Sequence, residues 1–251
     1  MIVLEKLSKR FGKKPVVEQV STQFEKGKVT SIIGPNGAGK STVLGMMARL
    51  LERDQGRVYI DETELANWQT QSLAKRLAVL KQSNSMNMRF TVEELVSFGR
   101  FPHSQGKLQA NDRQKVATAM AYLGLTDLAN RYLDELSGGQ RQLAFIAMVL
   151  AQDTDYVLLD EPLNNLDIKH SLTIMKNIQA LARDLGKAVI IVIHDINFAA
   201  SYSDYIVALK NGAVMADGKV DEVIDAKVLE SIYEVPFNIV EVQGKKMCTY
   251  Y

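Results

Sequence analysis

Apolar and polar residues alternate in short segments over the first third of the chain, and turn-forming residues separate these segments. Short segments with β-branched residues predict strands, and a helical spacing of apolar residues predicts a helix. We expect strands at 2–7, 16–24, 29–33, 56–60 and 77–81, and helices at 40–51 and 71–76.

The middle of the chain has a helical pattern instead. Apolar residues keep a helical spacing from 92 to about 124, and Thr91 with Glu94 predicts a capping box at the start of this segment. The helical spacing resumes after Gly138 and continues to Leu150. A continuous apolar run at 156–159 then predicts a buried strand.

The last third returns to an alternation of helix and strand. A helix is expected at 169–185, and the β-branched run at 188–193 predicts a strand that is covered on both faces. Asn211 and Gly212 predict a hairpin turn. Together these segments predict an α/β fold with a mostly parallel sheet, interrupted near residues 85–150 by a helical insertion.

The composition is that of an ordinary globular protein. The chain has 251 residues, of which 47% are hydrophobic and 24% are charged. Its 30 Lys and Arg residues nearly balance 29 Asp and Glu residues, so a net charge of +1 gives no field for binding a nucleic acid. The longest apolar run, at 143–151, is about half of the roughly 20 residues that cross a bilayer.

The single cysteine, Cys248, suggests a reducing compartment. The first residues show no long apolar segment after a basic start, so we expect no signal peptide. These observations predict a protein of the cytoplasm, without a nucleic-acid partner.

The first candidate for chemistry is a glycine-rich segment between a predicted strand and a predicted helix. This is the context of a P-loop, in which backbone N–H groups bind phosphate oxygens beside the positive end of a helix. Lys40 is expected to reach the β- and γ-phosphates, and the Ser41 hydroxyl to bind Mg²⁺. A glycine turn before an ordinary helix is the alternative. The segment consists of Gly34, Pro35, Asn36, Gly37, Ala38, Gly39, Lys40, Ser41 and Thr42.

Two carboxylates, Asp160 and Glu161, follow the predicted strand at 156–159. The carboxyl ends of parallel strands are where such sheets bind their ligands. Asp160 suits the outer shell of Mg²⁺, and Glu161 suits the orientation and deprotonation of an attacking water. A solvated acidic turn is the alternative for this segment taken alone.

A second phosphate site is expected at 137–140. Ser137 can cap a helix whose first exposed amides belong to Gly138 and Gly139, and Gln140 follows them. An ordinary capped helix accounts for the serine, but it has no need of two glycines and a glutamine in this order.

Taken in order along the chain, these segments resemble the ATP-binding cassette (ABC) ATPases. The matching positions are 34–42 (Walker A), Gln82 (Q-loop), 136–140 (signature), 156–162 (Walker B), 164–167 (D-loop) and His194 (switch histidine). The resemblance covers nearly the whole chain and implies a P-loop NTPase core with a mostly parallel sheet, an antiparallel N-terminal β subdomain and an inserted α-helical subdomain. It implies a single ABC ATPase domain, with the core at 1–84 and 152–251 and the helical signature subdomain at 85–151.

The resemblance also implies the roles of single residues. Those implied as catalytic are Glu161, His194, Lys40 and Gln82, and those implied as ligands of the Mg²⁺ that accompanies ATP are Ser41, Gln82 and Asp160. Phe11 matches the aromatic residue that stacks on adenine, which is usually Tyr in this family. Because stacking tolerates different bases, ATP is expected and GTP stays open. Asn164 and Asn165 are bulkier than the small pair common in the D-loop, which bears on the geometry of the dimer.

In this family, ATP lies between the P-loop of one subunit and the signature of another. The resemblance therefore implies a homodimer in which residues 37–42 of one chain and 137–140 of the other enclose the nucleotide. It also implies a peripheral subunit on the cytoplasmic face of the cell membrane, which docks on a separate integral-membrane permease and serves a substrate-binding protein indirectly.

Residues 98–103 resemble a motif in importers of iron–siderophore complexes, haem or cobalamin. The implied function is ATP hydrolysis that powers uptake of an iron–siderophore or a related metal chelate. A soluble ABC-type ATPase that acts as a nucleotide-dependent switch on a non-transport partner is the alternative. Residues 83–103 are rich in Met and Phe, which suit an adaptable apolar groove, and this segment is expected to line the surface on which the permease docks, although Phe90 and Val96 also suit a core.

Overall fold

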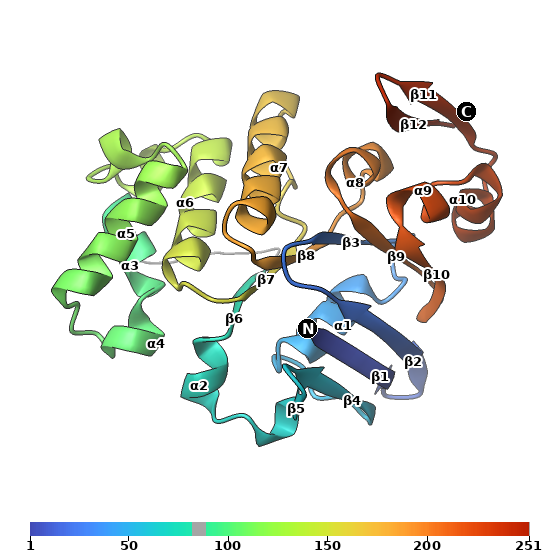
Figure 1. The fold of residues 1–251 in the computed structure, drawn as a ribbon, viewed down its shortest axis with the longest axis horizontal. Coiled ribbons are helices and arrows are strands. Elements are labelled where there is room, and N and C mark those ends of the chain that lie inside the picture. The colour runs from blue at the N-terminus through green and yellow to red at the C-terminus, as the bar shows by residue number, and fades with distance from the viewer. Residues whose placement is uncertain (82–88, 251) are drawn as a thin grey trace. The chain divides into compact units, whose positions relative to one another are not determined.

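The computed structural model describes residues 1–81 and 89–250 (Figure 1). The chain divides into two compact units, of which the first is Met1–Trp68 with Ile178–Tyr251 and the second is Gln69–Asn177. Gln82, expected to act in catalysis and metal binding, lies outside the described residues. Within the described residues, no helix combines the length and the apolar character that crossing a membrane requires.

The first unit contains an antiparallel sheet with the strand order β2-β1-β4-β5. Its strands are β1 (Ile2–Phe11), β2 (Lys14–Phe24), β4 (Gln55–Ile60) and β5 (Thr63–Glu64). Apolar side chains such as Ile2, Leu4 and Ile60 are buried on one face of this sheet. The sheet is the antiparallel N-terminal subdomain that the resemblance implies.

A second set of strands in the first unit has the order β10-β9-β3-β8. These strands are β3 (Val29–Ile33), β8 (Ala188–Val192), β9 (Tyr205–Lys210) and β10 (Ala213–Lys219). β3 is parallel to both β8 and β9, and every residue of β3 and β8 is buried, as in strands covered on both faces. Asn211 and Gly212 form the turn between β9 and β10 with positive φ, as the sequence predicts.

The helices of the first unit are α1 (Lys40–Met47), η1 (Leu65–Asn67), α8 (Ile196–Tyr202), α9 (Val220–Val223) and α10 (Ala226–Tyr233). A C-terminal hairpin of β11 (Asn238–Val242) and β12 (Lys245–Thr249) completes it. α7 (Ile168–Arg183) runs from the second unit into the first. α1 is shorter than the predicted helix because Arg49 adopts a φ of 56° and the N–H of Leu50 turns back to the carbonyl of Gly45.

The second unit pairs two parallel strands with a group of helices. Its strands are β6 (Leu77–Leu80) and β7 (Tyr156–Asp160). Its helices are α2 (Thr70–Ala74), α3 (Val92–Phe98), α4 (Phe101–Ser104), α5 (Ala110–Tyr122), η2 (Thr126–Leu128), η3 (Leu133–Glu135) and α6 (Gly138–Ala151). α3, α5 and α6 pack on one another (Figure 1). The α/β class, the mostly parallel strands and the helical insertion are therefore as predicted.

Candidate nucleotide-binding and hydrolysis site

The phosphate loop, residues 34–39, connects the carboxyl end of β3 to the first residue of α1. Gly34, Gly37 and Gly39 have φ angles of 143°, 78° and 95°. Residues with a side chain rarely adopt such angles, so the path of this loop depends on glycine.

Two of these glycines also permit close approach of other backbone segments. A Cβ atom on Gly34 would lie 2.0 Å from the carbonyl oxygen of Leu209, and one on Gly39 would lie 2.6 Å from the carbonyl oxygen of Val16. The phosphate loop is therefore packed against β9 and β2 with no room for a methyl group at either position.

Lys40 folds back over this loop from the start of α1. Its side chain is 5% exposed, and its Nζ donates hydrogen bonds to the carbonyl oxygens of Gly34 (2.8 Å) and Pro35 (2.9 Å). A positive charge is thus held at the loop, beside the positive end of the helix, where a P-loop binds phosphate. Ser41 follows in the first turn of α1.

Phe11 ends β1 and is 52% exposed. The ammonium of Lys9 lies 5.8 Å from the centre of its ring and is bound to the carboxylate of Asp54 at 2.8 Å. The hydrogen bond from Lys9 and that from the N–H of Arg10 hold the pKa of Asp54 below its usual range. The ring therefore has a charged neighbour and a large accessible surface, as a base-stacking residue needs.

His194 follows β8 and is exposed. Because β8 and β3 are parallel neighbours, with Val192 opposite Ile32, His194 and the phosphate loop extend from the same edge of the sheet. Asp195 caps α8 by accepting a hydrogen bond from the N–H of Phe198 (3.0 Å). The structure therefore brings together the P-loop and the predicted switch histidine within the first unit.

In the second unit, Asp160 is the buried last residue of β7, and Glu161 follows it with a φ of 49°. The side-chain amide of Asn164 donates a hydrogen bond to the Glu161 carboxylate. Asn164, singled out in the sequence only as a departure from the family, thus orients the predicted general base. The hydroxyl of Ser41 and the carboxylate of Asp160 are oxygen donors of the kind that Mg²⁺ prefers, so their chemistry fits that ion.

Ser137 caps α6 as predicted. Its hydroxyl accepts from the N–H of Gln140 (3.3 Å), and the Gln140 side chain accepts from the N–H of Ser137 (3.1 Å), which completes a capping box. The early amides of α6 belong to Gly138, which is exposed, and to Gly139, which is buried.

A histidine that sequence reasoning missed lies against the signature. A Cβ on Gly139 would lie 2.0 Å from Cδ2 of His170, so this glycine makes room for the imidazole. Nδ1 of His170 is 2.7 Å from the Asp167 carboxylate, and the backbone N–H and ring of His170 hold the pKa of Asp167 below its usual range. The Asp-x-x-His spacing across the start of α7, with Asp167 just before the helix and His170 in its first turn, was the available signal.

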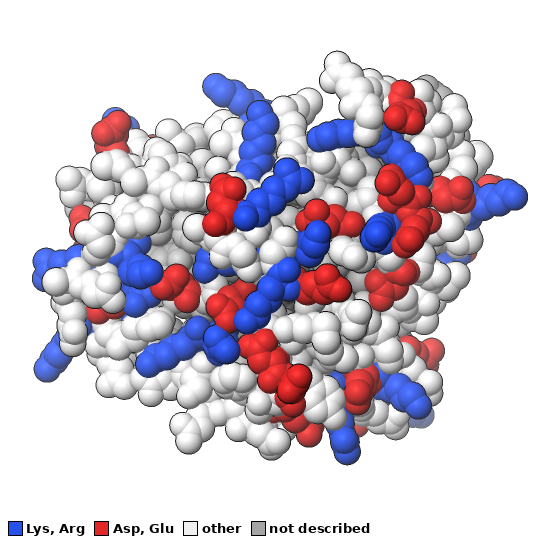
Figure 2. All heavy atoms as spheres, in the orientation of Figure 1, with Lys and Arg blue, Asp and Glu red and all other residues white. Residues whose placement is uncertain are grey.

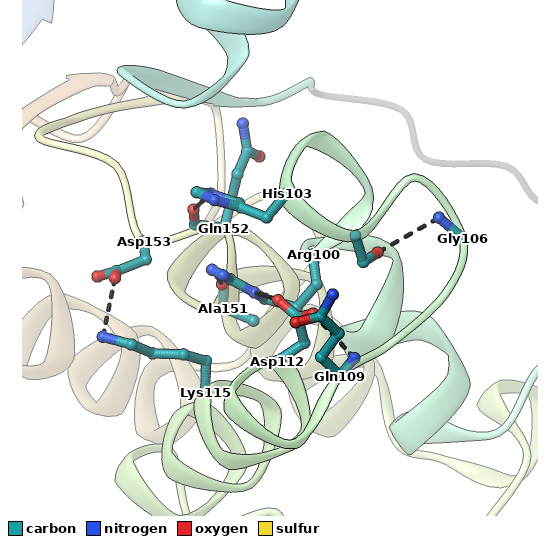
Figure 3. Close-up of polar contacts among 10 residues, drawn as sticks. Arg100, His103, Gly106, Gln109, Asp112, Lys115, Ala151, Gln152 and Asp153 are labelled. Carbon is teal, nitrogen blue, oxygen red and sulfur yellow. Dashed lines mark hydrogen bonds and ion pairs between the residues drawn. The ribbon is translucent and has the colours of Figure 1, made fainter.

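The segment 98–103, which resembles a motif of chelate importers, is held by buried polar contacts (Figure 3). Arg100 is 3% exposed, and it donates to the Asp112 carboxylate (3.0 Å) and to the carbonyl of Ala151 (2.8 Å). The N–H of Gln109 and the Arg100 guanidinium together hold the pKa of Asp112 below its usual range, against the effect of burial.

Two further contacts attach this segment to the end of α6. Nε2 of His103 is hydrogen-bonded to the carbonyl of Gln152 (3.0 Å) (Figure 3). A Cβ on Gly99 would lie 2.1 Å from the carbonyl oxygen of Met148, so the two backbones are in close contact. The side chain of Gln152 in turn donates to the carbonyls of Ala74 (2.6 Å) and Leu77 (3.2 Å), next to β6. These contacts fix residues 98–103 to the end of α6, and Gln152 connects that end to β6. We call this group of contacts around Arg100 the joint.

Two aromatic residues of this segment are exposed. Phe98 is 47% exposed and Phe101 is 60% exposed, and Phe98 packs edge-on against Phe90 at 5.0 Å between ring centres. Of the predicted permease-docking segment, residues 83–88 lie outside the described residues.

The surface charges are mixed. Lys and Arg side chains are interspersed with Asp and Glu side chains over the face shown in Figure 2, in agreement with the net charge of +1. On that face no broad area of one sign covers the described residues.

Comparison with known proteins extends these observations. The family described as ABC transporter matches residues 17–164, more than half of the chain. The chain is 52% identical over 251 residues to the petrobactin import ATP-binding protein YclP of Bacillus subtilis (strain 168), with 100% of both chains covered. It is 40% identical to the iron(3+)-hydroxamate import ATP-binding protein FhuC of the same strain, with 94% of this chain and 88% of the relative covered.

Among solved structures, the dimeric structure of a bacterial ABC transporter cassette is similar at a TM-score of 0.77 and 30% identity, covering 88% of this chain and 99% of that one. The family match spans the phosphate loop, residues 137–140 and the acidic end of β7. The chain belongs to the ABC transporter family.

Proposed function

We propose that this chain is the ATP-hydrolysing subunit of an importer, which powers uptake of an iron–siderophore or a related metal chelate through a separate membrane permease. The observation that carries this proposal is the similarity over the full length to a petrobactin import ATP-binding protein. A second relative is named for import of iron(3+)-hydroxamate. The proposal therefore concerns the class of chelate.

Within this function, the nucleotide lies on the phosphate loop. The loop amides and Lys40 bind its phosphates, and Phe11 stacks on its base. The Ser41 hydroxyl and the carboxylate of Asp160, with Gln82, would hold the Mg²⁺, which would neutralise phosphate charge when bound. Ser137, Gly138, Gly139 and Gln140 of a second copy close over the γ-phosphate.

Hydrolysis then needs a positioned water. Glu161, oriented by Asn164, accepts its proton, and His194 contacts the γ-phosphate. Closure of the dimer on ATP and its reopening after hydrolysis supply the mechanical output, because ATP binds the closed state preferentially.

The permease is the proposed partner for this output. The chain is then a peripheral subunit at the cytoplasmic face of the membrane, and it meets the substrate-binding protein only indirectly. The exposed Phe98 and Phe101 belong to the proposed docking surface, and the joint at Arg100 transmits force between this surface and α6. The alternative, a nucleotide switch on a soluble partner, lacks support among the relatives, which are named as import proteins.

The purified chain tests the enzymatic part directly. With Mg-ATP it should release phosphate, whereas Lys40→Ala should lose both nucleotide affinity and turnover because a ground-state contact is gone. Competition between ATP and GTP for the same site measures how far a site with Phe11 as its base-stacking residue distinguishes adenine from guanine. Equal affinity for ATP in the wild type and in Lys40→Ala would contradict the assignment of the phosphate loop.

A further inference from the structure

Three segments of the first unit that are far apart in the sequence meet at Gly212. The N–H of Gly212 donates to the carbonyl of Ala38 in the phosphate loop (3.2 Å), and the carbonyl of Gly212 accepts from the N–H of Glu18 in β2 (2.8 Å). The turn between β9 and β10 is thus bonded to the phosphate loop on one side and to β2 on the other.

The approach of these backbones leaves no space for a side chain. A Cβ on Gly212 would lie 2.6 Å from the carbonyl oxygen of Val16 and 3.2 Å from Cα of Val17. A Cβ on Gly39, in the phosphate loop, would lie 2.6 Å from the same Val16 oxygen. Gly212 in the turn and Gly39 in the loop therefore both pack closely against the carbonyl group of Val16 in β2.

β2 belongs to the hairpin that carries Phe11. Phe11 is paired with Lys14, the first residue of β2, across the tight turn. Farther along β2, the Thr22 hydroxyl donates to the Asp217 carboxylate of β10 (2.5 Å), which is a second connection between these strands. The position of the Phe11 hairpin relative to the phosphate loop therefore depends on the β9–β10 turn.

We propose that Gly212 is a positioning residue that sets the distance between the base-stacking Phe11 and the phosphate loop. The inference rests on the nucleotide site of the proposed function. A nucleotide binds through its base and its phosphates at once, so its affinity depends on this distance. Inorganic tripolyphosphate binds through the loop alone. A methyl group at position 212 displaces β2 and leaves the phosphate contacts in place.

The test compares Gly212→Ala with Gly244→Ala. Gly244 lies in the β11–β12 turn with a φ of 73°, close to the 81° of Gly212, but a Cβ there would meet nothing within 4 Å. The two variants therefore share the conformational cost of alanine at positive φ and differ in the contact with β2. Calorimetry with Mg²⁺ measures the affinity of each for a non-hydrolysable ATP analogue and for tripolyphosphate.

Gly212→Ala is expected to lose affinity for the ATP analogue by roughly five- to 150-fold, the range for loss of a base–aromatic stack. Its affinity for tripolyphosphate should equal that of the wild type, and Gly244→Ala should match the wild type with both ligands. In a Phe11→Ala background, the Gly212→Ala change should cause little further loss, because the stack is already gone.

Equal behaviour of Gly212→Ala and Gly244→Ala, in a wild type that binds the ATP analogue, would overturn the inference alone. A matching loss for tripolyphosphate would also overturn it, because Gly212 would then support the phosphate loop itself. A wild type that binds neither ligand would overturn the proposed function together with the inference.

Thermal melting of every variant shows whether it folds. If Gly212→Ala does not fold, Thr22→Val takes its place, since it removes the hydroxyl that connects β2 to Asp217 and adds no atoms at the turn. The same selective loss for the ATP analogue is expected, at smaller amplitude. Unchanged affinity for the analogue in Thr22→Val would contradict the proposal.

Discussion

The phosphate loop and the joint around Arg100 are held by opposite kinds of contact. In the loop, Gly34 and Gly39 let backbone meet backbone at distances that exclude a methyl group. In the joint, the buried Arg100 side chain donates hydrogen bonds to the Asp112 carboxylate and to the carbonyl of Ala151 at the end of α6. Substitutions that add atoms should therefore destabilise the loop, and substitutions that remove polar atoms should destabilise the joint.

The largest effect is expected at Glu161, where a substitution changes chemistry and leaves both kinds of contact intact. Glu161→Gln keeps the size of the side chain but cannot accept the proton of water, so turnover should fall by about 10²–10⁴-fold while ATP binding persists. Phosphate release measures turnover, and gel filtration with Mg-ATP should show an accumulated dimer. A monomeric variant that hydrolyses ATP at a near-normal rate would show that the base is assigned wrongly.

The joint is tested next by removing one member of its ion pair. Arg100→Met leaves the Asp112 carboxylate buried without its guanidinium, which should lower the free energy of unfolding by about 3–5 kcal/mol. Replacing both residues, Arg100→Met with Asp112→Leu, should restore much of this loss. Urea unfolding measures the free energy of unfolding. A loss in Arg100→Met no larger than that of a typical surface substitution would show that the buried ion pair does not stabilise the joint.

The loop is tested by adding one methyl group at two nearby positions. Gly39→Ala meets the carbonyl of Val16, whereas Gly37→Ala meets nothing within 4 Å, and both glycines have positive φ. Gly39→Ala should therefore be less stable than Gly37→Ala by about 1–3 kcal/mol in urea unfolding. Equal stability of the two variants would mean that β2 moves away without cost.

The smallest effect is a dependence on pH. Because the folded state lowers the pKa of Asp112, this group stabilises the protein above its unfolded pKa of about 3.9, and the stabilisation is lost as the pH falls through the folded pKa. The free energy of unfolding should thus decline below about pH 4. Asp112→Asn should show a shallower decline, and an identical decline would exclude Asp112 as a contributor.

The sequence predicts the parts of this molecule that depend on local patterns. The buried strands β7 and β8 follow from continuous apolar runs, and the phosphate loop and the cap at Ser137 follow from short motifs. The roles assigned to the site residues stay predictions that the variants above test.

Contacts between distant residues could not be predicted in the same way. The C-terminal hairpin packs on α8 through Asn197, whose side-chain amide pairs with the backbone of Cys248. The Arg100–Asp112 pair and the junction at Gly212 likewise join segments that the chain brings together only when folded. Residues 98–103 were singled out by resemblance, but no pattern in the sequence indicates that Arg100 is buried.

Uptake of radioactive iron by cells tests the central claim most directly. Cells that lack this chain should fail to accumulate iron supplied as one member of a panel of ferric siderophores that includes petrobactin and a hydroxamate. The wild-type chain should restore that uptake, and Glu161→Gln, made at the same level, should not. Unchanged uptake of every chelate in the cells without the chain would contradict the account.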